Sequence, residues 1–257
     1  YEATRVDCPK TATAIDTERA ANVLRTLGCI ATLILGGDGT SRAFTKGWRD
    51  AILLPVSTGT NNVFPCFAEA TIAGAALGLI ASGKVPLEEV TVATKLIDIT
   101  IEGEDPDIAL IDAVVTGEAF VGARALLEGD ELKAAVLTRA DPAAVGITAI
   151  GGLVQPLAET QPGGLLLRMG KGSRFVNAPI APGLYQQVKV ESWTSVAYNE
   201  VMEFEGPCVI AVDGERERSI RRGQKFQMKV SLTGPLVIDI EKAMEFAAGS
   251  GAFVGHL

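Results

Sequence analysis

The feature that most limits how this chain can fold is a glycine-dense turn directly after a short apolar run. Residues 31–35 (ATLIL) form the apolar run, and residues 36–40 (GGDGT) follow it. An apolar run of this length, with glycines nearby on both sides, is typical of a strand buried on both faces. Three glycines in four positions let a ligand approach the backbone, and a helix start after them exposes N–H groups to an anion. The segment therefore predicts a phosphate-binding strand–turn–helix unit.

Asp38 is the one carboxylate in this turn. A bare carboxylate would repel phosphates, so its presence favours either a magnesium ligand or a base that accepts a proton from a hydroxyl group. The alternative is a plain Gly-Asp-Gly turn, because Asp-Gly is a common turn pair. Thr40 or Ser41 is expected to cap a helix over residues 41–48.

The order of strand and helix signals predicts two domains. A second buried strand is expected over residues 51–56 and a helix over 67–82, and this alternation favours a parallel sheet of Rossmann-like type. Beyond residue 84, short strands separated by Gly, Pro and Asp turns predict a β-sandwich. The fold class is thus α/β plus all-β, with a nucleotide-binding domain at 1–88, a β-sandwich at 89–238, and a C-terminal helix in 239–257 that packs back on the first domain.

Composition excludes several classes of function. The formal net charge is −8, from 23 Lys and Arg against 31 Asp and Glu, which argues against nucleic-acid binding. The four cysteines show no metal-ligand spacing, and the single histidine leaves little material for Ser-His-Asp chemistry. No apolar run is long enough to span a membrane, so we expect a cytoplasmic protein. Because the sequence begins with Tyr1 and enters an α/β unit partway through, a preceding segment is expected to be missing.

Three stretches make the chain similar to the NAD kinase, diacylglycerol kinase and sphingosine kinase superfamily. They are GGDGT at 36–40, PVSTGTNN at 55–62, and Asp-Gly-Glu at 213–215. Within the superfamily the chain most closely resembles the acetoin-catabolism protein X group, whose members are NAD-kinase-like, through GGDGT at 36–40, STGTNNVFP at 57–65 and EAFVGARA at 118–125. The second loop departs from the lipid-kinase pattern, since Asn61 replaces a glycine and Val63 stands where an aspartate would fall.

This resemblance implies an ATP-dependent kinase with its active site between the two domains. It would use Mg²⁺ to transfer a phosphoryl group to a hydroxyl of NAD or a related small-molecule acceptor, with a link to acetoin catabolism. A lipid kinase of the diacylglycerol type and a non-catalytic nucleotide-binding regulatory protein are the alternatives. The oligomeric state is left open, a homo-oligomer included.

The resemblance also assigns roles to individual residues. The catalytic carboxylates would be Asp38, which also binds the metal, and Glu215, and both are expected to face one cleft. Asp213-Gly214 alone reads equally well as a hairpin turn. Residues 60–62 read by default as a helix start, but the resemblance gives them a nucleoside-binding role. The predicted nucleotide-binding residues are Gly36, Gly37, Gly39, Thr40, Thr58, Gly59, Thr60, Asn61 and Asn62.

Overall fold

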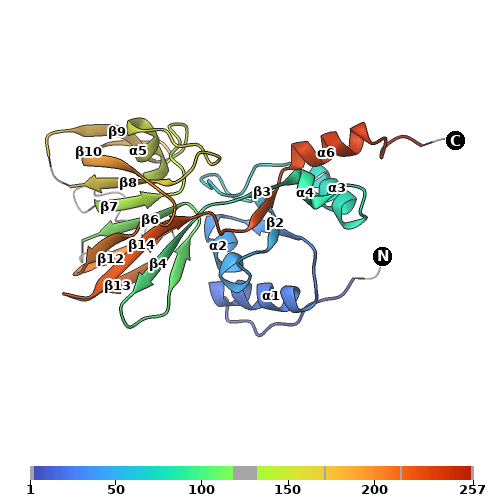
Figure 1. The fold of residues 1–257 in the computed structure, drawn as a ribbon, viewed down its shortest axis with the longest axis horizontal. Helices are drawn as coiled ribbons and strands as arrows, with labels where there is room; N and C mark the ends of the chain where they lie inside the picture. Colours follow the sequence, from blue (N-terminus) through green and yellow to red (C-terminus); the bar gives the residue numbers. More distant parts are fainter. Residues whose placement is uncertain (1–2, 118–131, 171, 215, 256–257) are drawn as a thin grey trace. The chain divides into compact units, whose positions relative to one another are not determined.

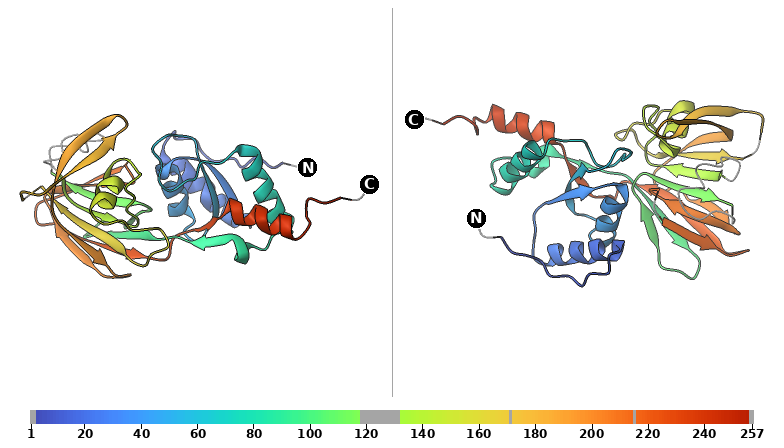
Figure 2. Two further views of the ribbon diagram at one scale, coloured as in Figure 1. Left: turned by 90° about the horizontal axis from the view of Figure 1, so that it is seen from above. Right: turned by 180° about the vertical axis from the view of Figure 1, so that it is seen from behind.

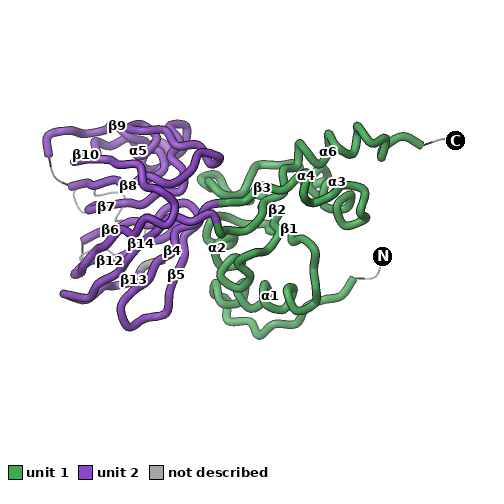
Figure 3. Tube along the Cα trace, viewed as in Figure 1, with its two compact units in different colours: residues 1–94, 233–257 green, residues 95–232 purple. Residues whose placement is uncertain are grey.

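The computed structural model describes residues 3–117, 132–170, 172–214 and 216–255. The chain divides into two compact units, coloured separately in Figure 3. Unit 1 comprises Tyr1–Thr94 with Thr233–Leu257, and unit 2 comprises Lys95–Leu232. The divisions fall a few residues inside the boundaries that the sequence suggested.

Unit 1 contains a four-stranded sheet in its described residues (Figure 1). The strand order is β1-β2-β15-β3, in which β2 runs parallel to both β1 and β15, and β3 runs antiparallel to β15. The predicted parallel sheet is therefore confirmed, with one antiparallel edge strand added. The strands are β1 (Thr32–Gly36), β2 (Ile52–Ser57), β15 (Leu236–Ile238) and β3 (Thr91–Ala93).

Helices cover this sheet on both faces. On one face, α1 and α2 pack through Ala21 and Phe44 against Ile34 and Leu53. On the other, α3 and α6 pack against β2 through small residues such as Ala76. The C-terminal helix therefore returns to the first unit, as predicted, and Figure 2 shows α3 and α6 side by side. The helices are α1 (Ala14–Thr26), α2 (Asp38–Gly47), α3 (Ala70–Ala81), α4 (Leu87–Val90) and α6 (Ile240–Gly249).

Unit 2 is built from two antiparallel sheets in its described residues. The larger sheet has the order β13-β12-β6-β7-β8-β10-β9, and the smaller has the order β11-β14-β4-β5. The larger consists of β6 (Asp112–Thr116), β7 (Leu132–Leu137), β8 (Gly164–Met169), β9 (Phe175–Ala181), β10 (Leu184–Val196), β12 (Cys208–Val212) and β13 (Arg216–Ile220). The smaller consists of β4 (Leu96–Ile101), β5 (Asp107–Ala109), β11 (Met202–Glu205) and β14 (Lys225–Ser231).

The two sheets enclose an apolar core, which confirms the predicted β-sandwich. Ile99 and Phe226 of the smaller sheet belong to the same buried cluster as Val136 and Ile210 of the larger one. Alternation along each strand produces this core, because every second side chain points to the same face. Helix α5 (Ile147–Val154) packs on the opposite face of the larger sheet.

Two helix boundaries differ from the predictions. The helix predicted over 41–48 begins at Asp38, because Gly37 and not Thr40 or Ser41 is its N-cap. Residues 60–62 do not begin a helix: α3 starts at Ala70, where the Glu69 carboxylate accepts the N–H groups of Thr71 and Ile72. None of the helices in the described ranges is both long enough and apolar enough to cross a membrane.

Candidate functional site

The glycine-dense turn joins β1 to α2. Gly36 is the last residue of β1, and Gly37 is the N-cap of α2 with an extended backbone and no side chain to cap the helix. The N–H groups in the first turn of a helix have no acceptor within that helix, and the helix dipole gives them a partial positive charge. The turn thus places an anion-attracting helix end at the carboxyl edge of the sheet.

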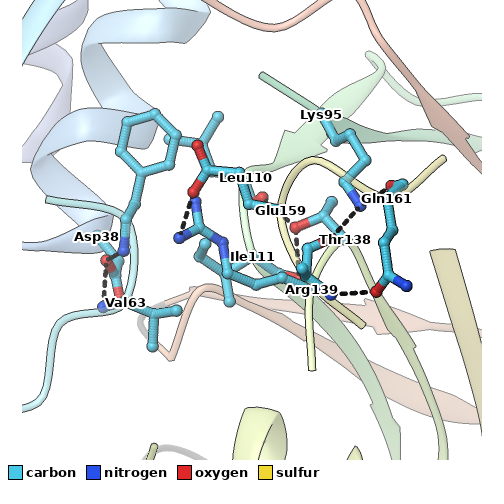
Figure 4. Close-up of polar contacts among 11 residues, drawn as sticks. Asp38, Val63, Lys95, Leu110, Ile111, Thr138, Arg139, Glu159 and Gln161 are labelled. Carbon is cyan, nitrogen blue, oxygen red and sulfur yellow. Dashed lines mark hydrogen bonds and ion pairs between the residues drawn. The ribbon is translucent and has the colours of Figure 1, made fainter. Parts of the chain in front are cut away.

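Asp38 is the first residue of α2, and its carboxylate binds the second predicted loop. The backbone N–H of Phe64 donates to Oδ1 at 2.7 Å, and that of Val63 lies 3.1 Å from both oxygens. Figure 4 shows Asp38 pointing toward the backbone at Val63. Hydrogen bonds to a charged acceptor are stronger than hydrogen bonds to a neutral one. Asp38 therefore ties two segments together that are 25 residues apart in sequence.

The second loop follows β2 and lies beside the first, because β1 and β2 are parallel neighbours. The N–H of Thr58 donates to the carbonyl of Gly36 at 3.3 Å, which joins the two loops through their backbones. The Ser57 hydroxyl donates to the carbonyl of Gly59 at 2.9 Å and accepts from Asn62 Nδ2 at 2.8 Å. The structure thus brings together all the predicted nucleotide-binding residues, which come from the segments 36–40 and 58–62.

The two ends of this loop differ in exposure. Thr58, Gly59, Thr60 and Asn61 are exposed, whereas Asn62 is only partly accessible. Exposed hydroxyl and carboxamide groups offer both donors and acceptors to a ligand. In the described part of the chain no three His, Cys, Asp or Glu side chains form a cluster that could hold a metal.

Asp213 lies in the turn between β12 and β13, and its side chain points into unit 2. It is only 5% exposed, and its carboxylate accepts N–H groups from Leu110, Ile111 and Asp112 at 2.8–3.2 Å. Both Asp213 and Gly214 have positive φ values. The Asp-Gly pair therefore forms a hairpin turn, which was one of the two interpretations that the sequence left open. Glu215 lies outside the described residues, as does the stretch 118–125, so the catalytic role of Glu215 stays a prediction.

Lys95, at the start of unit 2, was not identified from the sequence. It is 5% exposed, and its Nζ donates to the carbonyls of Gln161 at 2.9 Å and Gly163 at 3.1 Å (Figure 4). Burial lowers the pKa of Lys95 to about 8, and Arg139 adds to this effect. The only signal in the sequence is a lysine that directly precedes the apolar pair Leu96-Ile97.

The family model for the acetoin catabolism protein X C-terminal domain matches residues 95–233, more than half of the chain. The acetoin catabolism protein X of Cupriavidus necator is 40% identical over 222 residues, covering 82% of this chain. The chain spans 61% of the length of that relative.

A solved structure extends the similarity to both units. The crystal structure of yeast NADH kinase complexed with NADH matches with a TM-score of 0.55 and 10% sequence identity. The match covers 89% of this chain and 67% of the yeast chain. At this level of identity the similarity establishes a shared NAD-kinase-like fold.

Proposed function

The chain belongs to the acetoin catabolism protein X family, and from its site we propose that it is an ATP-dependent kinase for a small-molecule hydroxyl group. One observation carries the proposal. Two loops meet at the carboxyl ends of the parallel strands β1 and β2, and a single carboxylate at the start of α2 joins them. Ligands of open α/β sheets bind at this edge.

The two loops divide the recognition of a nucleotide between them. The first turn of α2 offers N–H groups and a positive helix end to phosphates. The exposed side chains of Thr60 and Asn61 offer hydrogen bonds to a ribose or base. NAD is a reasonable acceptor to test first, because the yeast protein of similar fold was crystallised with NADH.

Phosphoryl transfer requires positioning and charge neutralisation more than covalent chemistry. Bound Mg-ATP would supply the phosphoryl group and the cation. Asp38 would either contribute one carboxylate ligand to that cation or accept the proton of the acceptor hydroxyl. Phosphates and water commonly supply most ligands of Mg²⁺, so a single carboxylate from the protein would be enough to position the ion that ATP carries.

A transfer assay tests this function. The chain is incubated with γ-labelled Mg-ATP and a panel of hydroxyl acceptors that includes NAD, and labelled products are separated and counted. We expect one acceptor to be labelled by the wild type and not by Asp38→Asn. The matched control is Asp50→Asn, an exposed aspartate just after α2, which should retain the wild-type rate. An Asp38→Asn variant with the wild-type rate would rule out a catalytic Asp38.

A second candidate is a nucleotide-binding regulator without turnover. Both oxygens of Asp38 already accept N–H groups of the second loop, which is what a residue with a purely architectural role would do. Calorimetric titration with Mg-ATP, read together with the transfer assay, separates the two functions, because a regulator binds the nucleotide but labels no acceptor. No observation on the described residues favours a lipid kinase.

The biological setting follows from the family. We propose that the activity serves acetoin catabolism, since both the matched family and the matched relative carry that description. A cytoplasmic location and a homo-oligomeric state stay predictions.

A further inference from the structure

Gly37 has no backbone requirement for glycine. Its φ of −105° and ψ of −167° describe an extended conformation that any residue adopts. What glycine provides here is space, since a Cβ atom at this position would lie 2.6 Å from Oδ1 of Asn62. That separation is far too short for a carbon–oxygen contact. The carboxamide of Asn62 therefore occupies the space that a side chain at position 37 would need.

The opposite end of the same carboxamide is held by a hydrogen bond. Nδ2 of Asn62 donates to Oγ of Ser57 at 2.8 Å, and a Cβ atom at Gly59 would lie 3.1 Å from it. Asn62 is partly buried, in contrast to its neighbours Thr60 and Asn61. The side chain of Asn62 thus extends from the glycine-dense turn to Ser57, at the start of its own loop.

The residues after Asn62 attach the loop a second time. The N–H groups of Val63 and Phe64 donate to Asp38, one residue beyond Gly37. The loop is consequently attached to the start of α2 through backbone N–H groups, directly beside the place where the Asn62 carboxamide lies close to Gly37. Contacts this close in sequence restrict both the position and the direction of the loop.

We propose that Asn62 is a positioning residue that sets the second loop against the glycine-dense turn and does not itself bind the nucleotide. It holds Thr60 and Asn61 at a fixed distance from the phosphate-binding end of α2. This inference rests on the proposed nucleotide-binding function and specifies which residues contact the ligand. Position 37 is glycine because a larger residue would clash with Asn62, and the exposed residues of the loop contact the ligand.

A double-mutant cycle between Gly37 and Asn62 tests the proposal. Affinity for Mg-ATP is measured by calorimetry for the wild type, Gly37→Ala, Asn62→Ala and the double variant. We expect each single change to weaken binding by about tenfold, which corresponds to about 1.4 kcal/mol. The double variant should bind no more weakly than Asn62→Ala alone, because the new methyl group occupies space that the carboxamide has left.

Asn61 provides the matched control. It precedes Asn62 directly and is exposed, so Asn61→Ala removes the same chemical group from the ligand side of the loop. Because Asn61 does not occupy the space at Gly37, Asn61→Ala should not recover the loss caused by Gly37→Ala, and this double variant should bind more weakly than Asn61→Ala alone. If the losses of Gly37→Ala and Asn62→Ala multiply, the ligand itself approaches Gly37 and the proposal is wrong.

Thermal unfolding of the same variants separates this inference from the proposed function. If Asn62→Ala lowers the unfolding temperature but leaves Mg-ATP affinity unchanged, Asn62 only stabilises the loop, and the positioning role is refuted. If the wild type does not bind Mg-ATP, the proposed function fails, and only the close packing of Asn62 against Gly37 can still be tested, from the unfolding temperatures. That packing is supported if adding Asn62→Ala restores the unfolding temperature lowered by Gly37→Ala. It is refuted if the two decreases in unfolding temperature add.

Discussion

Replacing Asp38 by asparagine tests how strongly its carboxylate attaches the second loop. Asparagine has the same size, but one of its two oxygens becomes an NH₂ group that faces the N–H groups of Val63 or Phe64. Hydrogen bonds to charged groups contribute about 1.5–3 kcal/mol each. Since one acceptor and the charge are lost while the other oxygen remains, we expect the free energy of unfolding of unit 1 to fall by about 2 kcal/mol.

Fluorescence during urea unfolding measures this loss. The chain has two tryptophans, of which Trp48 belongs to unit 1 and Trp193 to unit 2. A Trp193→Phe background therefore lets Trp48 report on unit 1 alone. The control is Asp50→Asn, which should lie within about 0.5 kcal/mol of the parent, as surface substitutions do. If Asp38→Asn lowers the free energy of unfolding by equally little, the carboxylate does not attach the loop.

The same variant shows why the transfer assay needs a binding measurement beside it. Asp38→Asn removes a candidate catalytic carboxylate and weakens the attachment of a candidate nucleotide-binding loop in one step. A loss of turnover at saturating Mg-ATP indicates a role in the chemistry, whereas a loss of affinity alone indicates the loop.

Three further predictions concern unit 2. Asp213→Asn should destabilise the unit by about 3 kcal/mol in urea unfolding, because it removes a buried charge that accepts three backbone N–H groups; a loss under about 1 kcal/mol would contradict this. The pKa of Lys95 is lowered to about 8 from 10.5, mainly by burial, so the cost of burying its charge is full below pH 8 and disappears toward pH 10.5. Relative to Lys95→Met, the wild type should therefore gain about 2 kcal/mol between pH 8 and pH 10, and a constant difference would argue against the shift. Phe226→Ala should cost about 3–5 kcal/mol, because Phe226 is fully buried and stacks on Phe204; a Ser219→Ala variant on the exposed face of β13 should cost little.

Local sequence signals were sufficient to predict the first of the two loops, the glycine-dense turn at residues 36–40. Consecutive glycines after an apolar run specify a tight strand-to-helix connection whatever the rest of the chain does. The error there was the helix start, because Thr40 and Ser41 are better caps by composition than Gly37. The helix begins earlier, which places Asp38 in its first turn and aims the carboxylate at the neighbouring loop.

The second loop could not be predicted by the same means. Thr60, Asn61 and Asn62 are typical of helix starts, yet the segment remains non-helical up to Ala70. Its conformation depends on contacts with Asp38 and Gly36, which belong to another strand–helix unit. Tertiary hydrogen bonds thus outweighed the local preference.

The direction in which the Asp213 carboxylate points depends on pairing between strands that are distant in the sequence. Asp213 reaches the backbone at Leu110 and Ile111 only because β12 pairs with β6. Asp-Gly in the sequence indicated the turn but not the direction of the carboxylate. Predicting that direction requires the strand order of the sheet.

Hydrogen–deuterium exchange with and without Mg-ATP tests the central claim most directly. The claim is that a nucleotide binds across the two loops at the carboxyl ends of β1 and β2. Peptides that cover residues 36–41 and 57–66 should both exchange more slowly when Mg-ATP is added, while the sandwich strands β8 and β10 serve as internal references. Slower exchange confined to other segments, or no change at saturating Mg-ATP, would contradict the account.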